Sequence, residues 1–200
     1  MKKYINAFKW YSLPLKPSDE YPVCSARDLF QTKLDKMYNE MSKQFKNSNQ
    51  VSLISAIVGE LGNNCFDHNL GQWKDVPGCW FDYEVEKNTL WIVISDRGQG
   101  IFNSLKRVVL NLKNEQEALE LAFHKKISGR SPERRGNGLK FVRNVINDNP
   151  RRGLFYSSGM SQIFFGGFGS SALHIISPFL KEKIVGGTFS LILWEIINEG

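Results

Sequence analysis

The sequence contains few cysteines and no long apolar run. Its three cysteines, Cys24, Cys65 and Cys79, are odd in number and lack the spacing of metal ligands. We therefore expect reduced structural thiols, neither a disulfide framework nor a zinc site. No stretch reaches the roughly 20 apolar residues of a membrane helix, and the N-terminus lacks the apolar core of a signal peptide. These absences argue against a membrane or secreted protein, so the expected compartment is the cytoplasm.

Motifs of nucleic-acid binding are also absent. The net charge is +6, but nucleic-acid recognition usually adds a basic stripe with docking features, and no known DNA-binding motif is present. The phosphates of a nucleotide, or an acidic protein partner, explain the charge at least as well. The apolar fraction of 42% and the charged fraction of 23% are those of a globular protein. A length of 200 residues fits one domain with an appendage.

What the sequence does contain is a segment, residues 51–69, with the pattern of an amphipathic helix. Its apolar residues recur at helical spacing: Ile54, Ile57, Val58, Leu61 and Cys65. Such a face can be buried against a sheet. Glu60, Asn64 and Asp67 share a polar face, because residues three, four and seven apart project from nearly the same side. A carboxylate and an amide placed in this way can hold a metal ion and a water. The alternative is an ordinary solvated face.

A buried strand followed by a glycine turn comes next. Residues 89–95 form a short, apolar, β-rich run that ends at Asp96, the first residue of the segment 96–100. A carboxylate at this exit can accept a hydrogen bond from an exocyclic amine such as that of adenine. Gly98 and Gly100 permit backbone angles that a Cβ would forbid. The alternative is a plain turn at the end of a strand.

A second glycine turn opens another helix. The turn consists of Arg135, Gly136, Asn137, Gly138 and Leu139. Apolar residues continue from it at helical spacing: Leu139, Val142, Val145 and Ile146. Free backbone N–H groups at a helix N-terminus, together with the helix dipole, favour phosphate oxygens. A lone glycine pair also occurs in plain linkers, but the joint presence and order of the three elements predict an ATP site.

Together these elements resemble the GHKL ATPases, which include gyrase B subunits, heat-shock chaperones, mismatch-repair ATPases, sensor histidine kinases and anti-sigma serine kinases. Residues 60–67 look like the N box of that superfamily, residues 96–100 like its Asp-x-Gly-x-Gly box, and residues 136–139 like its later glycine box. Residues 186–188, before a last apolar run, are similar to its final Gly-Thr strand. The resemblance covers roughly residues 50–197.

The resemblance implies a role for each matching residue. Asn64 would ligate Mg²⁺, which bridges phosphates and keeps several waters. Asp96 would recognise adenine, and Thr188 would help hold a water on the adenine side. Glu60 would be the general base that activates water in the hydrolytic branches. The other implied contacts shape the pocket and its phosphate side: Gly98, Gly100, Arg135, Gly136, Asn137, Gly138 and Leu139.

Two residues at the end of the helix predicted at residues 51–69 indicate different branches of the superfamily. His68, with Glu60 and Asn64, resembles the pattern of the anti-sigma serine kinases, whereas Asp67 resembles the gyrase and chaperone pattern. Both are candidate nucleotide contacts, although a lone histidine at a helix end is also commonly a surface or cap residue. Three functions therefore stay open: a Mg²⁺-dependent ATPase, a serine protein kinase, and an ATP-binding interaction module without turnover.

A sensor kinase is disfavoured. The only histidines are His68, His124 and His174, and none stands in the His-Glu or His-Asp pair of a phosphoaccepting helix. The second domain that gyrase, chaperone and mismatch-repair relatives place after the ATPase is not recognisable. We expect a stand-alone module whose output lies in another protein, and a homodimer is an open alternative.

The region between the two glycine turns, residues 101–135, resembles the ATP lid of the superfamily. A helix is predicted at residues 114–123. Basic residues that could donate to phosphate oxygens follow it: Lys125, Lys126, Arg130, Arg134 and Arg135. For any one of them a solvated basic loop is the alternative.

We expect an α/β two-layer sandwich of the Bergerat type, with a mixed, mostly antiparallel sheet and helices on one face. Residues 1–50 are predicted as an N-terminal extension with one helix, and residues 51–200 as the ATP-binding domain. Further strands are expected at residues 153–158 and 161–165, and the resemblance implies a last strand at residues 189–194. Residues 166–183 look less regular, with a loop at 166–171.

Overall fold

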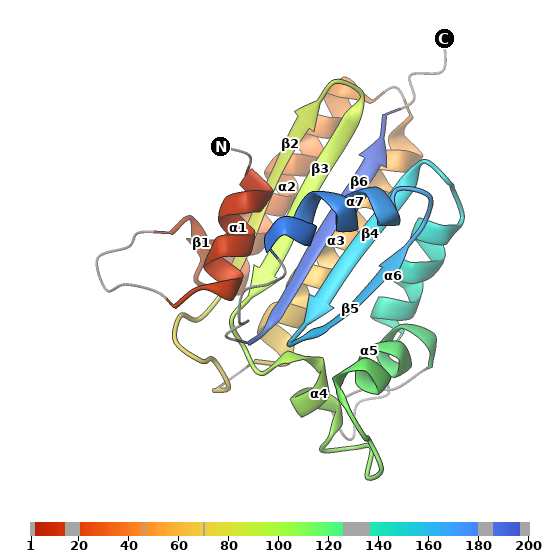
Figure 1. The fold of residues 1–200 in the computed structure, drawn as a ribbon. Helices are drawn as coiled ribbons and strands as arrows, with labels where there is room; N and C mark the ends of the chain where they lie inside the picture. The colour runs from red at the N-terminus through yellow and green to blue at the C-terminus, as the bar shows by residue number, and fades with distance from the viewer. Residues whose placement is uncertain are drawn as a thin grey trace.

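The computed structural model describes residues 3–14, 21–45, 47–69, 71–125, 137–179 and 186–196. Its elements in chain order are α1 (Lys3–Ser12), β1 (Val23–Cys24), α2 (Arg27–Gln44), α3 (Ser48–Asp67), β2 (Cys79–Glu86), β3 (Thr89–Asp96), α4 (Gly100–Leu105), α5 (Glu115–His124), α6 (Gly138–Asn147), β4 (Arg152–Ser158), β5 (Ser161–Phe165), α7 (Gly169–Ile176), the 3-10 helix η1 (Ser177–Phe179) and β6 (Thr188–Glu195). Figure 1 shows their arrangement. The predicted α/β class is confirmed.

The strands form one open sheet in the order β1-β2-β3-β6-β4-β5. All pairings between the described strands are antiparallel, so the mixed character that we expected is not found there. The last strand of the chain, β6, lies in the middle between β3 and β4 (Figure 1). The predicted strands at 89–95, 153–158, 161–165 and 189–194 are confirmed within a residue at each end.

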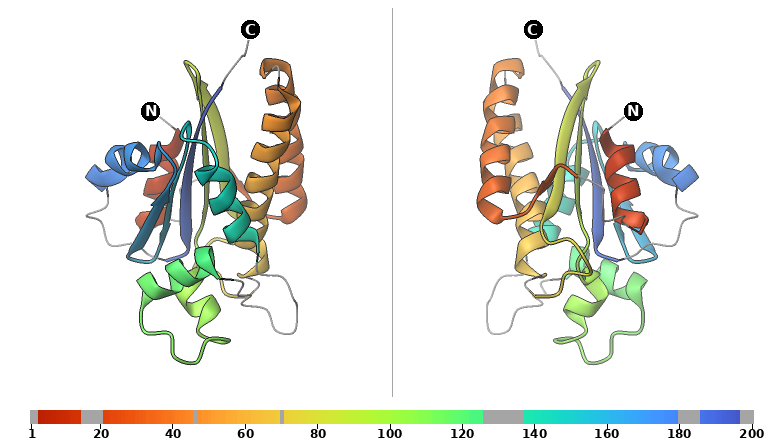
Figure 2. Two further views of the ribbon diagram at one scale, coloured as in Figure 1. Left: turned by 90° about the vertical axis from the view of Figure 1, so that its right-hand side faces the viewer. Right: turned by 90° about the vertical axis from the view of Figure 1, so that its left-hand side faces the viewer.

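Helices cover both faces of the sheet, which corrects the expectation of helices on one face. Figure 2 shows α2, α3 and α6 on one side and α1 and α7 on the other. The reason lies in the strand side chains, which alternate between the two faces. In β3, Ile92 and Ile94 pack into the core beneath α2 and α3, whereas Val93 packs into the core beneath α1. Because the side chains on both faces of the strand are apolar, each face is buried beneath helices.

The first 50 residues contribute to both cores. The helix expected there is α2, which buries one face at helical spacing: Phe30, Leu34, Met37 and Met41. The structure adds α1, whose aromatic residues Phe8, Trp10 and Tyr11 are buried on the opposite face of the sheet. It also adds the short edge strand β1. The N-terminal segment is therefore packed as part of the same α/β unit.

The segment after β5 is more regular than the sequence indicated. A loop was expected at residues 166–171, but α7 begins at Gly169. Ala172 and Ile176, four residues apart, are buried in the core of the α1 face, which explains why the chain is helical there. Residues 180–185 lie outside the described residues.

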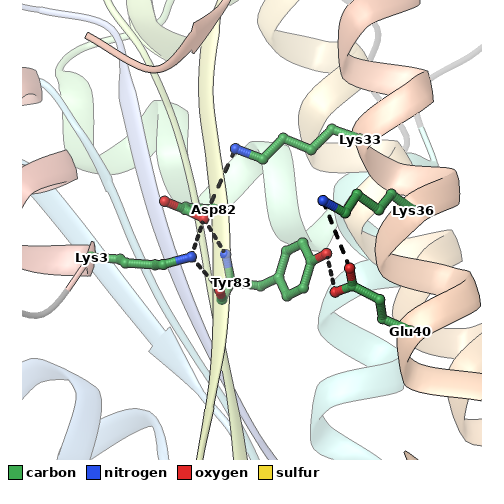
Figure 3. A network of polar contacts seen from close by, with 6 residues as sticks. All are labelled: Lys3, Lys33, Lys36, Glu40, Asp82 and Tyr83. Carbon is green, nitrogen blue, oxygen red and sulfur yellow. Dashed lines mark hydrogen bonds and ion pairs between the residues drawn. The ribbon is translucent and has the colours of Figure 1, made fainter. Parts of the chain in front are cut away.

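A polar network ties α1 and α2 to the middle of β2 (Figure 3). β1 pairs with Cys79 and Trp80, and within the described part of the chain no strand pairs with the rest of β2 on that side. Lys3 Nζ donates to Asp82 Oδ1 at 2.8 Å and to the carbonyl oxygen of Tyr83 at 3.0 Å, and the Tyr83 hydroxyl donates to Glu40 at 2.6 Å. The bond from Lys3 occupies the backbone carbonyl group of Tyr83, which an open edge would otherwise expose.

In the part of the chain that the structure describes, no helix combines the length and the apolar character that crossing a membrane requires.

Candidate functional site

One row of opposed residues crosses the entire sheet at the end where β3 leads into α4. From edge to edge the row is Cys24, Cys79, Asp96, Thr188, Ser158 and Ser161. Directly opposed residues project their side chains to the same face of a sheet. The row therefore places polar groups and thiols side by side on the α3 face, with Asp96 and Thr188 at its centre.

Asp96 carries the carboxylate of this row and is almost completely enclosed, with 1% of its surface exposed. Its Oδ1 accepts hydrogen bonds from Asn69 Nδ2 and from the backbone N–H of Gly98, each at 2.8 Å. Its Oδ2 accepts a hydrogen bond from the Thr188 hydroxyl. Burial raises the pKa of Asp96, while the hydrogen bonds from Thr188, Gly98 and Asn69 oppose that rise. The carboxylate is thus a buried acceptor that several donors share.

Asp96 lines a small cavity between α3, α4 and the sheet. The cavity is lined by Asn64, His68, Asn69, Asp96, Gly100, Ile101, Ser104, Tyr156 and Thr188. Five of these residues, which come from three separate segments, were predicted as site residues: Asn64, His68, Asp96, Gly100 and Thr188. The volume is about 20 Å³, which is room for about one water. A nucleotide would enter only if the lining side chains moved.

The segment 96–100 contains glycines where a side chain would collide with its neighbours or where the backbone angle favours glycine. An added Cβ at Gly98 would lie 2.0 Å from the Asn69 side chain. Gly100 has a φ of +75°, which favours glycine, and a Cβ there would lie 3.0 Å from Ser158 Oγ. The Ser158 hydroxyl also accepts the N–H of Ile101 at 2.8 Å. The turn is thereby held against β4.

His68 is the C-cap residue of α3 and lines the cavity. Its Nδ1 is 3.0 Å from the Ser104 hydroxyl, and its carbonyl oxygen accepts a hydrogen bond from the Gln99 side chain. Burial lowers the pKa of His68, so the imidazole is neutral at pH 7. His68 is therefore both a cap and a cavity residue.

Glu60 lies outside this cavity, on an exposed part of α3. Its carboxylate adjoins the start of α6, because a Cβ added at Gly138 would lie 2.2 Å from Glu60 Oε2. Asn137 is the exposed N-cap residue of α6, and Leu139 packs partly buried against the core. The polar stripe of α3 thus reaches from the cavity to the N-terminus of α6.

Asp67 faces a different neighbour. It forms an ion pair with Arg27 of α2, which also donates to the Asn63 side chain at 3.3 Å. Asp67 lies roughly 60° around the helix from Asn64, since three residues complete less than one turn. The structure therefore brings Asn64 and His68 to the cavity and turns Asp67 towards α2.

Arg97 has a role that the sequence did not indicate. Its side chain is completely buried and pairs with Asp75, with Nε 2.7 Å from Oδ1. Its Nη1 donates to the carbonyl oxygens of Trp10 and, at 3.0 Å, of Leu13, at the end of α1. This guanidinium anchors the 96–100 turn to α1. Its partners lie more than 80 residues away along the chain or in a loop, so spacing could not reveal them.

The predicted lid region begins with α4 and α5, which lie at one end of the sheet (Figure 1). The helix predicted at residues 114–123 is confirmed as α5, with Asn114 Oδ1 accepting the N–H of Glu117 at 2.8 Å. Glu115 accepts the N–H of Met160 at 2.8 Å, which ties α5 to the β4–β5 turn. Lys125 follows α5 and is exposed. The remaining lid and glycine-turn residues lie outside the described residues: Lys126, Arg130, Arg134, Arg135 and Gly136.

Sequence comparison adds no assignment: the chain matches no protein-family model and no curated protein. Among the described residues, no group of three or more His, Cys, Asp or Glu side chains is placed to hold a metal ion. Cys24, Cys65 and Cys79 are free and buried in the structure.

Proposed function

We propose that this protein binds Mg-ATP as GHKL ATPases do, with adenine at Asp96 and the phosphates near the N-terminus of α6. The observation that carries the proposal is the convergence of Asn64, Asp96, Gly100 and Thr188 on one cavity. The resemblance assigned these residues to one site, and they come from segments far apart in the chain.

The adenine end is supported by the donors around Asp96. The Asn69 amide donates to Oδ1 in the way that the exocyclic amine of adenine would. Thr188 lies directly opposite on β6 and donates to Oδ2. Binding would exchange one of these donors for the amine. Displacement of that donor would enlarge the small cavity, and the amine would keep the buried Asp96 carboxylate hydrogen-bonded.

The phosphate end is supported by the geometry of α3 and α6. α6 begins at Gly138, and its first N–H groups and dipole favour phosphate oxygens. Asn64 would hold Mg²⁺, which needs few protein ligands because phosphates and waters supply the others. Bound Mg²⁺ would neutralise phosphate charge. Asn64 lines the cavity on the same helix that carries Glu60, so one helix can reach both the ion and the reacting phosphate.

Hydrolysis would use Glu60 as the base. Its carboxylate lies against Gly138, at the helix end where a phosphate would bind. A water between the two would be within reach of the carboxylate, which is the geometric requirement for general-base catalysis.

A serine protein kinase is the second candidate, and one observation favours it. The kinase-like pattern of Glu60, Asn64 and His68 has two members in the cavity, whereas the gyrase-like Asp67 is paired with Arg27. In that reaction a serine hydroxyl of a partner protein takes the place of water. In either case the output would be read by another protein.

The experiment is a parallel measurement of Mg-ATP binding by calorimetry and of phosphate release. The wild-type chain is compared with Glu60→Gln, Asn64→Ala and the control Glu86→Gln. Glu86 lies in the β2–β3 hairpin, at the opposite end of β3 from Asp96. We expect Glu60→Gln to bind ATP but to release phosphate at least about 100-fold more slowly, and Asn64→Ala to lose Mg²⁺-dependent affinity.

The outcomes separate the candidates. Wild-type binding without phosphate release would exclude the hydrolase and favour the kinase or the interaction module. Unchanged release by Glu60→Gln would remove Glu60 from the reaction. Failure of the wild-type chain to bind Mg-ATP would refute the proposed function.

A further inference from the structure

Two cysteines continue the polar row from Asp96 to the edge of the sheet. Cys79 is directly opposite Asp96, and Cys24 is directly opposite Cys79 on the edge strand β1. Opposed antiparallel residues have Cα atoms about 4.5–5.5 Å apart. Disulfides span Cα separations of about 4.4–6.8 Å. The backbone therefore already holds Cys24 and Cys79 at a separation that a disulfide can bridge.

The thiols also contact one another. The Cys79 thiol is within hydrogen-bonding reach of both Cys24 and Cys65, and Cys65 is next to Asp96. The hydrogen bond from Cys79 lowers the pKa of Cys24 to about 7, against the effect of burial and with help from the charge of Lys33. The thiolate is the nucleophilic form of cysteine. Cys24 is therefore the reactive member of the pair, and the same contacts raise the pKa of Cys79.

We propose that Cys24 and Cys79 form a redox modification site, at which hydrogen peroxide makes an intramolecular disulfide beside the nucleotide site. A cysteine pair in a reducing compartment is usually a transient sensor when it is oxidised. The pairing of Cys24 with Cys79 follows from their register, whereas Cys65 comes from α3.

The reaction has two balanced steps. The Cys24 thiolate attacks one oxygen of the peroxide, the O–O bond breaks, and hydroxide leaves and takes up a proton. The product is a sulfenic acid, in which the sulfur has been oxidised by two electrons. The Cys79 thiol then loses its proton and attacks the Cys24 sulfur, the S–O bond breaks, and a second water forms. The sum is two thiols and one peroxide giving one disulfide and two waters.

The second part of the inference rests on the proposed function. Disulfide formation draws the Cys79 sulfur towards Cys24 and removes its hydrogen bond with Cys65, the neighbour of Asp96. Asp96 is held between Cys79 and Thr188 in the row, so its position is sensitive to this change. We expect oxidation to weaken Mg-ATP binding about tenfold, which is the effect of one hydrogen bond. A thiol reductant should restore it.

The first test uses the full chain, reduced and then treated with hydrogen peroxide. Remaining thiols are alkylated, and intact mass and non-reducing peptide maps are recorded. We expect one alkylated thiol, the loss of two hydrogen atoms, and a peptide that links Cys24 to Cys79. Cys65→Ala should still form this link, whereas Cys24→Ala should not. Three alkylated thiols after treatment, a link to Cys65, or a link between two chains would overturn the assignment.

The second test measures the Mg-ATP affinity of the reduced, oxidised and re-reduced chain. Peroxide-treated Cys24→Ala controls for methionine oxidation. A tenfold weaker affinity that reverses in the wild type and is absent in Cys24→Ala supports the coupling. Equal affinities for reduced and disulfide-linked chains would refute the coupling while the disulfide stands. Failure of the reduced chain to bind Mg-ATP would refute the proposed function, and the mass data would still decide the disulfide.

Discussion

At the scale of single residues, Asp96 and His68 are two groups of the cavity whose pKa values are shifted by burial. Asp96 is almost completely buried, and burial raises its pKa even though several donors point at it. His68 is kept neutral by burial next to the Ser104 hydroxyl. Perturbed titratable groups that meet in a cavity are typical of functional sites. These two groups meet in the cavity that also holds Asn64 and Thr188.

The half-buried His68 predicts that the protein loses stability in acid. Because burial lowers its pKa below the unfolded value of 6.5, the unfolded chain binds the proton more readily. The contribution of neutral His68 is therefore complete above pH 6.5 and is lost as the pH falls below it. We expect His68→Gln to lose less stability than wild type between about pH 7.5 and pH 5.5, measured by urea unfolding. The control is His174→Gln, on α7; if both variants behave like wild type, the pKa of His68 is not lowered in the folded protein.

At the scale of elements, the contact between α2 and α3 depends on the absence of one side chain. A Cβ at Gly62 would lie 2.0 Å from the ring of Phe30, which is fully buried. The helices can approach this closely only because position 62 is glycine. Gly59, three residues earlier on α3, is different, because a Cβ there would lie 3.6 Å from Leu34.

Alanine substitutions at these two glycines should therefore have opposite effects. We expect Gly62→Ala to lower the free energy of unfolding by about 1–3 kcal/mol, because the Phe30 ring must move. Gly59→Ala should raise it by about 0.5–1 kcal/mol, because alanine is the better helix former. Denaturant unfolding of the two variants measures both. Equal effects would show that α2 and α3 are farther apart than described.

The anchor between α1 and the 96–100 turn can be tested through Arg97. Arg97→Met leaves Asp75 and the α1 carbonyl oxygens without their donor, which should cost about 2–4 kcal/mol of unfolding free energy. Faster amide exchange at residues 3–14 should accompany it, together with weaker Mg-ATP binding, because the turn loses its support. The control is Arg151→Met, which removes an exposed ion pair with Glu195. An unchanged exchange rate in α1 would contradict the anchor.

At the scale of the whole molecule, most strands and the core beneath α3 could be predicted from the sequence because their signals are local. The apolar spacing in α3, the β-rich run of β3 and the two glycine turns lie within short windows of the chain. Together with the resemblance, they predict that Asn64, Asp96, Gly100 and Thr188 lie close together, and the structure places all four around one cavity. The β2 strand is not predicted from the sequence, because the second half of this strand carries acidic residues and is half-buried or exposed.

Other features depend on contacts between distant segments, which no window of sequence contains. Asn69 lies two residues beyond the predicted stripe, yet it supplies a hydrogen bond to Asp96. The covering of the second sheet face by α1 and α7 follows from apolar residues on both sides of β3 and β6, which a strand pattern alone does not assign to partners. The glycines and serines at the start of α7 resemble a loop. Its helical form depends on burial of Ala172 and Ile176.

The measurement that tests the central claim most directly is the affinity of the wild-type chain and of Asp96→Asn for Mg-ATP and for Mg-inosine triphosphate. Inosine carries a carbonyl oxygen where adenine carries its exocyclic amine. Because two acceptors cannot pair, the wild-type chain should prefer ATP by about tenfold or more. Asp96→Asn, whose amide can donate, should lose that preference. Equal binding of both nucleotides by the wild-type chain, or binding of neither, would contradict the assignment of Asp96 to adenine.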